Sequence, residues 1–237
     1  MIMGGELLVN WVAALSGLVG HGWHWTTDGK IKMNIVATPH DQPWVHAPAR
    51  IPGSAEEGFD CGLLTIIHNN VFSGKSVHSF CMECYKVVVC LETLAQVHKM
   101  EDWQQGECAE NGLACKVGAE RRNYVQRKWG AYFYCRGVEE GRERYKAVRT
   151  WVDENLGQDI KVYLKRACTE FEQHMGDSSG WQLIERQDEI EKEAKEIFDY
   201  APSDTIQPMV VQRNTHDLWK RWDEDNQPPI TYHEEGE

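Results

Sequence analysis

The sequence predicts a mixed α+β domain, and three patterns carry this prediction. Asp28-Gly29 is a two-residue hairpin signal beside alternating apolar and polar residues at 30–35. Residues 85–89 form a short β-branched segment that is typical of a buried strand. Residues 137–156 repeat apolar side chains at helical spacing, Gly157 supplies a stop, and the alternating segment 160–164 follows as a strand. These separated strands and helices favour α+β over α/β.

An apolar run near the N-terminus predicts a buried helix. Its apolar side chains recur at helical spacing, at Leu7, Leu8, Trp11, Leu15 and Leu18. The run LLVNWVAALSGLV is shorter than the about 20 residues that a membrane span needs. A secretory signal would have Lys or Arg before its apolar run, and none precedes this one. We therefore expect a cytoplasmic protein whose thiols stay reduced.

The remaining elements are predicted from turn and capping signals. Residues 37–60 contain four of the eight prolines and predict an ordered loop. We further expect a strand over residues 61–72, a helix over 91–103, a cysteine-bearing loop over 104–118, and a last helix over about 180–200 with Asp177 as its N-cap. The predicted domain thus has an N-terminal helix and hairpin, a cysteine-rich middle and a helix–strand–helix C-terminal half.

Charge is distributed unevenly along the 237 residues, whose formal net charge is −12. Residues 116–149 carry ten Lys/Arg against four Glu, a local +6, whereas residues 182–237 carry six Lys/Arg against fifteen Asp/Glu, a local −9. The overall acidity disfavours nucleic acid and anionic membranes as partners. We expect one metal-stabilised domain over residues 1–202 and an acidic extension over 203–237, with Trp219 and Trp222, that screens the basic segment.

Four cysteines are candidate metal ligands. Cys81 and Cys84 have the Cys-x-x-Cys spacing at which two thiolates can bind one tetrahedral ion. Cys108 and Cys115 lie downstream in a loop that contains Gly and Asn, so they are the candidates for the other two positions. Because no compact four-cysteine run is present, zinc is the expected metal. An iron–sulfur cluster with ligands scattered along the chain is the alternative.

Other interpretations of the cysteines and histidines stay open. His78 or Cys168 would replace one ligand of the wider-spaced pair. Redox catalysis is disfavoured, because the Cys-x-x-Cys pair precedes a strand and does not open a helix after one. Burial as inert core cysteines suits Cys61 and Cys90, which lie in apolar segments. A second metal site with two imidazoles and a carboxylate would use His40, Asp41 and His46.

The basic segment, residues 116–149, combines cationic and aromatic side chains, which suits phosphate and base recognition. Residues 132–134 predict a strand that ends at Arg136, where a helix begins. A helix N-terminus attracts anions, and a guanidinium can donate two hydrogen bonds to a phosphate or carboxylate. We therefore expect Arg136 to bind an anion, with Arg121 and Arg122 as further candidates. The alternative is a solvated helix whose arginines pair with nearby glutamates.

Glu170 is the candidate catalytic residue. It lies in the charged segment KRACTEFE, just beyond the strand predicted at 160–164, where a carboxylate can act as acid or base. A solvated charged turn is the alternative. The sequence thus predicts a metalloprotein enzyme that acts on a small anionic or nucleotide-like substrate. It indicates neither the reaction nor the oligomeric state. A zinc-stabilised nucleic-acid-binding or regulatory protein using residues 121–149 is the competing hypothesis.

Overall fold

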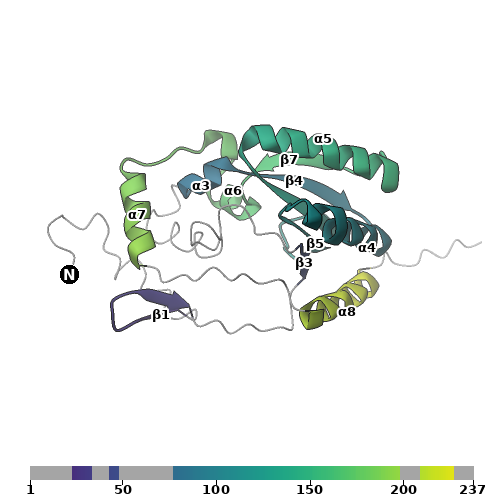
Figure 1. Ribbon diagram of the computed structural model, residues 1–237, viewed down its shortest axis with the longest axis horizontal. Helices are drawn as coiled ribbons and strands as arrows, with labels where there is room; N and C mark the ends of the chain where they lie inside the picture. The colour runs from purple at the N-terminus through teal and green to yellow at the C-terminus, as the bar shows by residue number, and fades with distance from the viewer. Residues whose placement is uncertain (1–22, 34–42, 48–76, 198–208, 227–237) are drawn as a thin grey trace, which may run out of the picture.

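The computed structural model describes residues 23–33, 43–47, 77–197 and 209–226 (Figure 1). Its main feature is a five-stranded antiparallel sheet with the strand order β3-β5-β6-β4-β7. The bounds of these strands are Trp44–His46 for β3, Cys84–Leu91 for β4, Cys115–Ala119 for β5, Trp129–Arg136 for β6 and Val162–Arg166 for β7. A separate hairpin pairs β1 (Trp23–Trp25) with β2 (Ile31–Met33). The predicted hairpin at Asp28-Gly29 is confirmed, although the connection is longer than two residues, because Thr26 and Lys30 bond each other beyond the strand ends.

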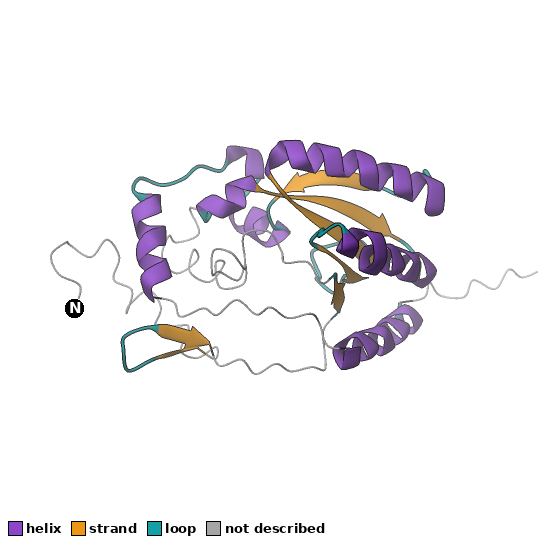
Figure 2. Ribbon diagram, in the orientation of Figure 1, coloured by secondary structure: helices purple, strands orange, loops and turns teal. Residues whose placement is uncertain are grey.

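Helices connect several strands of the sheet and also follow its last strand (Figure 2). They are α3 (Ser79–Glu83), α4 (Leu94–Trp103), α5 (Gly137–Asn155), α6 (Thr169–Met175), α7 (Gln187–Ile197) and α8 (Met209–Asp225), with a π-helical turn η2 (Gln104–Cys108) and a 3-10 turn η3 (Ser178–Gly180). The mixed α+β class is therefore confirmed. Within the described ranges, no helix combines the length and the apolar character that crossing a membrane requires.

The chain from residue 84 to residue 166 runs β4-α4-β5-β6-α5-β7. This is the β-α-β-β-α-β connection of split βαβ folds, with β4 and β6 as the central strands and β3 added at the β5 edge. Thr93 begins α4 with a capping box, in which its side chain and that of Gln96 each accept from the other's backbone N–H. Gly137 begins α5 at a positive φ of 74°, which favours glycine at the sharp turn from strand to helix.

The two faces of the sheet differ in chemistry because side chains alternate along each strand. On the apolar face, β4 and β6 bury residues that include Val87, Val89, Ala131 and Phe133. Helices α4 and α5 pack on this face (Figure 2). On the other face, which we call the polar face, β4, β5 and β6 carry Lys86, Lys116, Tyr132 and Tyr134. Among the described residues, the larger hydrophobic core therefore lies on this apolar face, and a smaller apolar cluster around Phe171 and Trp181 lies apart from it.

Helix α8 adds to the same core, although it belongs to the predicted acidic extension. Trp219 is fully buried, and its Nε1 donates to the Pro43 carbonyl at 2.8 Å. The ring of Trp219 meets that of Trp129 edge to face. The Lys128 Nζ of the basic segment lies 2.8 Å from Asp223 Oδ1 of α8. This part of the extension thus packs on the domain and contacts the basic segment.

Several elements differ from the sequence predictions. Residues 44–46 form β3 where a loop was expected, and residues 115–119 form β5 within the expected cysteine-bearing loop, because the two segments pair with each other. Asp177 caps only the short η3, and its side chain accepts from Ser179 N; α7 begins later, at Gln187. The helix predicted near Leu7 and the strand predicted over 61–72 lie outside the described residues.

Candidate functional site

Lys86 lies on the central strand of the polar face and is almost fully enclosed. It is only 6% exposed. Its Nζ donates to Cys168 Sγ at 3.2 Å and lies 5.9 Å and 5.6 Å from the ring centroids of Tyr132 and Tyr134. Burial by itself lowers the pKa of Lys86, but Cys168, Tyr134 and Cys84 act in the opposite direction and raise it well above its usual value. Lys86 is therefore a buried cation at neutral pH.

Lys116 lies on the neighbouring part of the same face and contacts aromatic rings. Its Nζ lies 4.5 Å from the ring centroid of Trp44 and 5.4 Å from that of Tyr132. Burial, together with the charges of Lys86 and Arg122, lowers its pKa to about 8. Among the residues that the structure describes, neither Lys116 nor Lys86 forms an ion pair with a carboxylate. The site thus holds one buried and one half-buried ammonium group, and the two repel each other.

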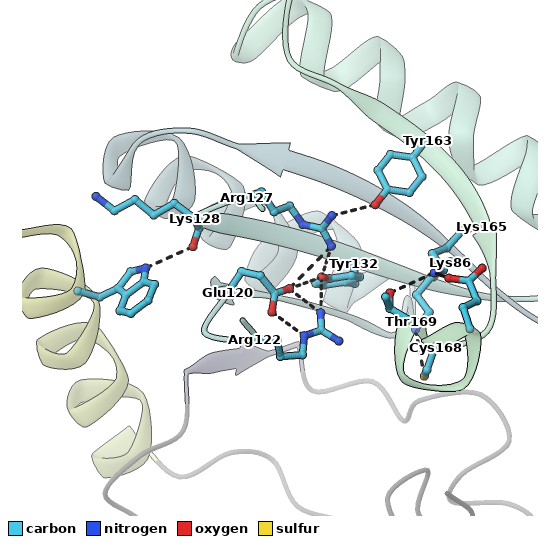
Figure 3. A network of polar contacts seen from close by, with 12 residues as sticks. Lys86, Glu120, Arg122, Arg127, Lys128, Tyr132, Tyr163, Lys165, Cys168 and Thr169 are labelled. Carbon is cyan, nitrogen blue, oxygen red and sulfur yellow. Dashed lines mark hydrogen bonds and ion pairs between the residues drawn. The ribbon is translucent and has the colours of Figure 1, made fainter. Parts of the chain in front are cut away.

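Glu120 is the centre of a hydrogen-bond network on the same face as Lys86 (Figure 3). Arg122 binds it with two bonds of 2.5 Å, and the Tyr132 hydroxyl donates to Oε2 at 2.7 Å. Arg127 donates to the hydroxyls of Tyr132 at 2.5 Å and Tyr163 at 2.8 Å. Burial would raise the pKa of Glu120, but the bonds from Arg122 and Tyr132 outweigh it and lower the pKa. Glu120 is therefore an ionised acceptor that holds both arginines at the polar face.

The cations of the polar face outnumber its carboxylates. Lys165 extends the group on β7, where its Nζ contacts Glu172 and bonds Thr169 Oγ1 at 3.1 Å (Figure 3). Among the side chains that the structure describes, this group contains five cations, at Lys86, Lys116, Arg122, Arg127 and Lys165, against two carboxylates, at Glu120 and Glu172. Arg127 Nε is buried and has no hydrogen-bond acceptor within the described part of the chain. The arrangement is suited to attract an anion.

The predicted anion-binding arginines have different places in the structure. Arg122 belongs to the network around Glu120. Arg121 is exposed in the connection between β5 and β6. Arg136 ends β6 and is exposed, and α5 begins directly after it, as predicted. However, the Arg136 N–H donates to Glu140 Oε2 at 2.8 Å, so a carboxylate of the chain already caps this helix N-terminus.

The structure does not bring the four predicted cysteine ligands together. Cys84 precedes Lys86 by two positions on β4 and so shares its polar face, whereas Cys115 shares the apolar face with Phe133. Cys108 and Cys115 are both buried in the hydrophobic core, where the Cys108 thiol and burial raise the pKa of Cys115. The sheet therefore separates the two cysteine pairs.

Cys168, the replacement ligand considered from the sequence, does approach the Cys-x-x-Cys pair. Burial raises the pKa of Cys81 well above its usual value and that of Cys84 to about 11, and the charge of Cys168 contributes to both shifts. His78 instead lies 3.4 Å from Glu191 and accepts from Phe80 N. Without a metal, both thiols of the pair are protonated at neutral pH.

The other predicted site residues are described only in part. His46 lies on β3, where burial and Lys116 lower its pKa to about 4, so the ring is neutral at physiological pH. Its predicted partners His40 and Asp41 lie outside the described residues. Glu170 is the second residue of α6, but its side chain lies outside the described part of the structure.

Sequence reasoning missed Lys86, Lys116 and Glu120. One signal was available: within the segment YKVVV, strand alternation places Lys86 on the face opposite Val87. A lysine in such a buried segment indicates a special environment. The pairing of β5 with β6, which brings Lys116 and Glu120 beside Tyr132, has no equally clear local signal.

Comparison of the chain with protein-family models, with curated proteins and with solved structures finds no match. The site must therefore be interpreted from its own chemistry.

Proposed function

We propose that the protein binds a small phosphate-bearing ligand of the nucleotide class on the polar face of the sheet. The observation that carries this proposal is the pair of neighbouring cations Lys86, which is buried, and Lys116, which is half-buried; neither has a carboxylate partner among the described residues. Placing an anion between them would offset both their desolvation and their mutual repulsion.

A purely structural role explains these lysines poorly. Burying an ammonium group is costly unless an opposite charge compensates it, and an apolar side chain at the same position is often as stable or more stable. Lys86 also pairs directly with Lys165 across β4 and β7, and like charges directly opposite destabilise a sheet. A bound anion would compensate the buried charge of Lys86 and reduce the repulsion between these lysines.

The surroundings of the lysines favour a phosphate ester with an attached ring. Trp44 and Tyr134 are half-buried on the same face, where they offer aromatic surface beside the cations. The guanidinium of Arg122 presents donors in a planar fork that matches phosphate oxygens. Because Lys86 is enclosed, the site suits a compact ligand better than a continuous strand.

Calorimetric titration with inorganic pyrophosphate and with ATP tests the proposal. Lys116→Met should weaken binding of both about tenfold, or about 1.4 kcal/mol, because it removes one cation and keeps the apolar stem. Lys146→Met, on the exposed surface of α5, is the matched control and should bind like wild type. Absence of binding by the wild type, or equal affinities for the two variants, would refute the proposal.

Binding of single-stranded nucleic acid is a second candidate function. It is favoured by the aromatic side chains that Trp44 and Tyr134 present on adjacent regions of one sheet face, a feature of sheets that stack bases. An oligonucleotide titration at several salt concentrations distinguishes the two functions. A polymer that contacts several cations should lose affinity steeply with salt, whereas weaker binding of the oligonucleotide than of ATP would favour the compact ligand.

Catalysis at the same site is suggested by the contact between Lys86 and Cys168. An ammonium group beside a sulfur favours the reactive thiolate, so Cys168 is a candidate nucleophile. The predicted acid or base, Glu170, lies two positions further along the chain. Alkylation by iodoacetamide, followed by peptide mass mapping, should modify Cys168 faster in the wild type than in Lys86→Met. Equal rates would remove the basis for this catalytic role.

The Cys-ligated metal predicted from the sequence is a separate proposal. Its ligand set would now centre on Cys81, Cys84 and Cys168, because Cys168 contributes to the raised pKa of both other thiols and therefore lies near them. Metal analysis of anaerobically purified protein tests it. A Cys81→Ser/Cys84→Ser variant should lose about one equivalent of zinc, or lose visible absorption if an iron–sulfur cluster is bound.

A further inference from the structure

Three potential metal ligands meet where α4 and α8 pack together. His98 and Glu101 lie one turn apart on α4, and His216 approaches from α8. His98 Nδ1 is 3.4 Å from Glu101 Oε2, and His216 Nε2 is 2.7 Å from Glu101 Oε1. One ligand atom from each residue lies within 4.8 Å of the other two. Within the described ranges, no other set of three His, Cys, Asp or Glu side chains is grouped so closely.

These separations are close to those of a metal centre. Zinc binds imidazole nitrogen and carboxylate oxygen at about 2.0–2.2 Å, so two donors on a tetrahedral ion lie about 3.3 Å apart. The distances around Glu101 bracket this value, and small side-chain rotations would equalise them. Two imidazoles and one carboxylate also leave coordination positions for water or substrate.

The surroundings hold the ligands and leave a route for an ion. The side chain of Glu101 is 10% exposed, whereas those of His98 and His216 are 42% and 34% exposed. The Trp219 ring lies 5.7 Å from the His98 ring and 5.1 Å from the His216 ring, between centroids, and so restricts both imidazoles. The π-helical turn η2 follows α4 directly, and such turns occur often at functional sites.

We propose that His98, Glu101 and His216 bind a divalent transition-metal ion, with zinc as the best-suited probe. The ion would link α4 of the domain to α8 of the acidic extension, so metal binding would stabilise the docking of α8. This site is distinct from the cysteines and from the polar face, and it does not depend on the proposed phosphate binding.

Zinc titration of protein that has been stripped with a chelator tests this site. Zinc at about 100 times its Kd should raise the Tm of the wild type by about 5–10 °C, whereas magnesium should have no effect. His98→Asn should weaken zinc binding roughly 100-fold, since even the loss of a supporting residue costs about 10–100-fold. Glu110→Gln, which removes an exposed carboxylate just after η2, should bind zinc like wild type.

A second variant separates a metal site from a hydrogen-bond network. Glu101→Gln retains the shape of the side chain but removes its charge, so it should also lose the zinc-induced rise in Tm. If Glu101→Gln fails to fold, His98→Asn decides alone, because its side chain is the most exposed of the three. The proposal is overturned if the wild type does not bind zinc, or if His98→Asn binds it as tightly as wild type. The latter result would place any bound zinc elsewhere, such as at the cysteines.

Discussion

The two faces of the central sheet are made by the same strands but have opposite chemistry. On β6, Phe133 packs under α4 and α5, whereas its neighbour Tyr134 faces Lys86. Helices α4 and α5 cover the apolar face, so its side chains are buried without a ligand. The polar face encloses more positive than negative charge among the described residues. The comparison teaches that one face supplies most of the stability, while the other retains an energetic cost that a ligand can offset.

The largest expected effect comes from the apolar face. Phe133→Ala should lower the free energy of unfolding by about 3–5 kcal/mol, because it removes a ring that is 1% exposed and leaves a cavity. Tyr134→Ala is the matched variant on the other face and should cost only about 1 kcal/mol, since Tyr134 is half-buried. Urea denaturation measures both. Similar losses would contradict the division of roles between the faces.

Glu120→Gln should give the next largest loss. The buried carboxylate compensates Arg122 and bonds Tyr132, so its neutralisation should cost about 2–4 kcal/mol at pH 7. The same change should tighten pyrophosphate binding, because the arginines lose their internal acceptor. The pKa of Glu120 is lowered from its usual value of 4.5, so its stabilisation is present above pH 4.5 and lost as the pH falls further. The variant should therefore have a flatter dependence of stability on pH in this acidic range.

The charge of Lys116 should make ligand binding to the polar face depend on pH. Its pKa in the folded protein is about 8, below the usual 10.5, so ATP affinity should fall about tenfold as the pH rises through 8 and the ammonium loses its charge. Between pH 8 and 10.5 the unfolded chain binds a proton that the folded chain does not, so the contribution of Lys116 to stability should rise with pH. Lys116→Met should abolish both trends. An unchanged pH profile of ATP affinity in this variant would assign the titration to another group.

The smallest effect on stability is expected at an ion pair of the basic segment that is partly exposed to solvent. Lys128 and Asp223 form a partly exposed pair between this segment and α8. A double-mutant cycle with Lys128→Met and Asp223→Asn should give a coupling energy of about 0.2–1 kcal/mol that decreases with salt. A coupling as large as the cost of Glu120→Gln would show that burial does not set the strength of these pairs.

Local patterns in the sequence were sufficient for individual elements. The hairpin at Asp28-Gly29, strand β4 and helix α5 each have a signal within their own residues, and each was predicted. Segments without such a signal were not: β3 exists because residues 44–46 pair with β5, which is remote in sequence. The same limit applied to the site, where Arg122 was predicted but its partner Glu120 was not.

The sequence by itself determined the α+β class, the alternation of side chains on each strand and the concentration of cations in residues 116–149, because these depend on neighbouring residues. The tertiary structure alone decided which chemical groups meet. Strand order placed Lys86 near Lys116 and separated Cys84 from Cys115, and the packing of α8 on α4 brought His216 to Glu101. Such encounters depend on long-range pairing and on the burial that follows from it, and no local pattern encodes them.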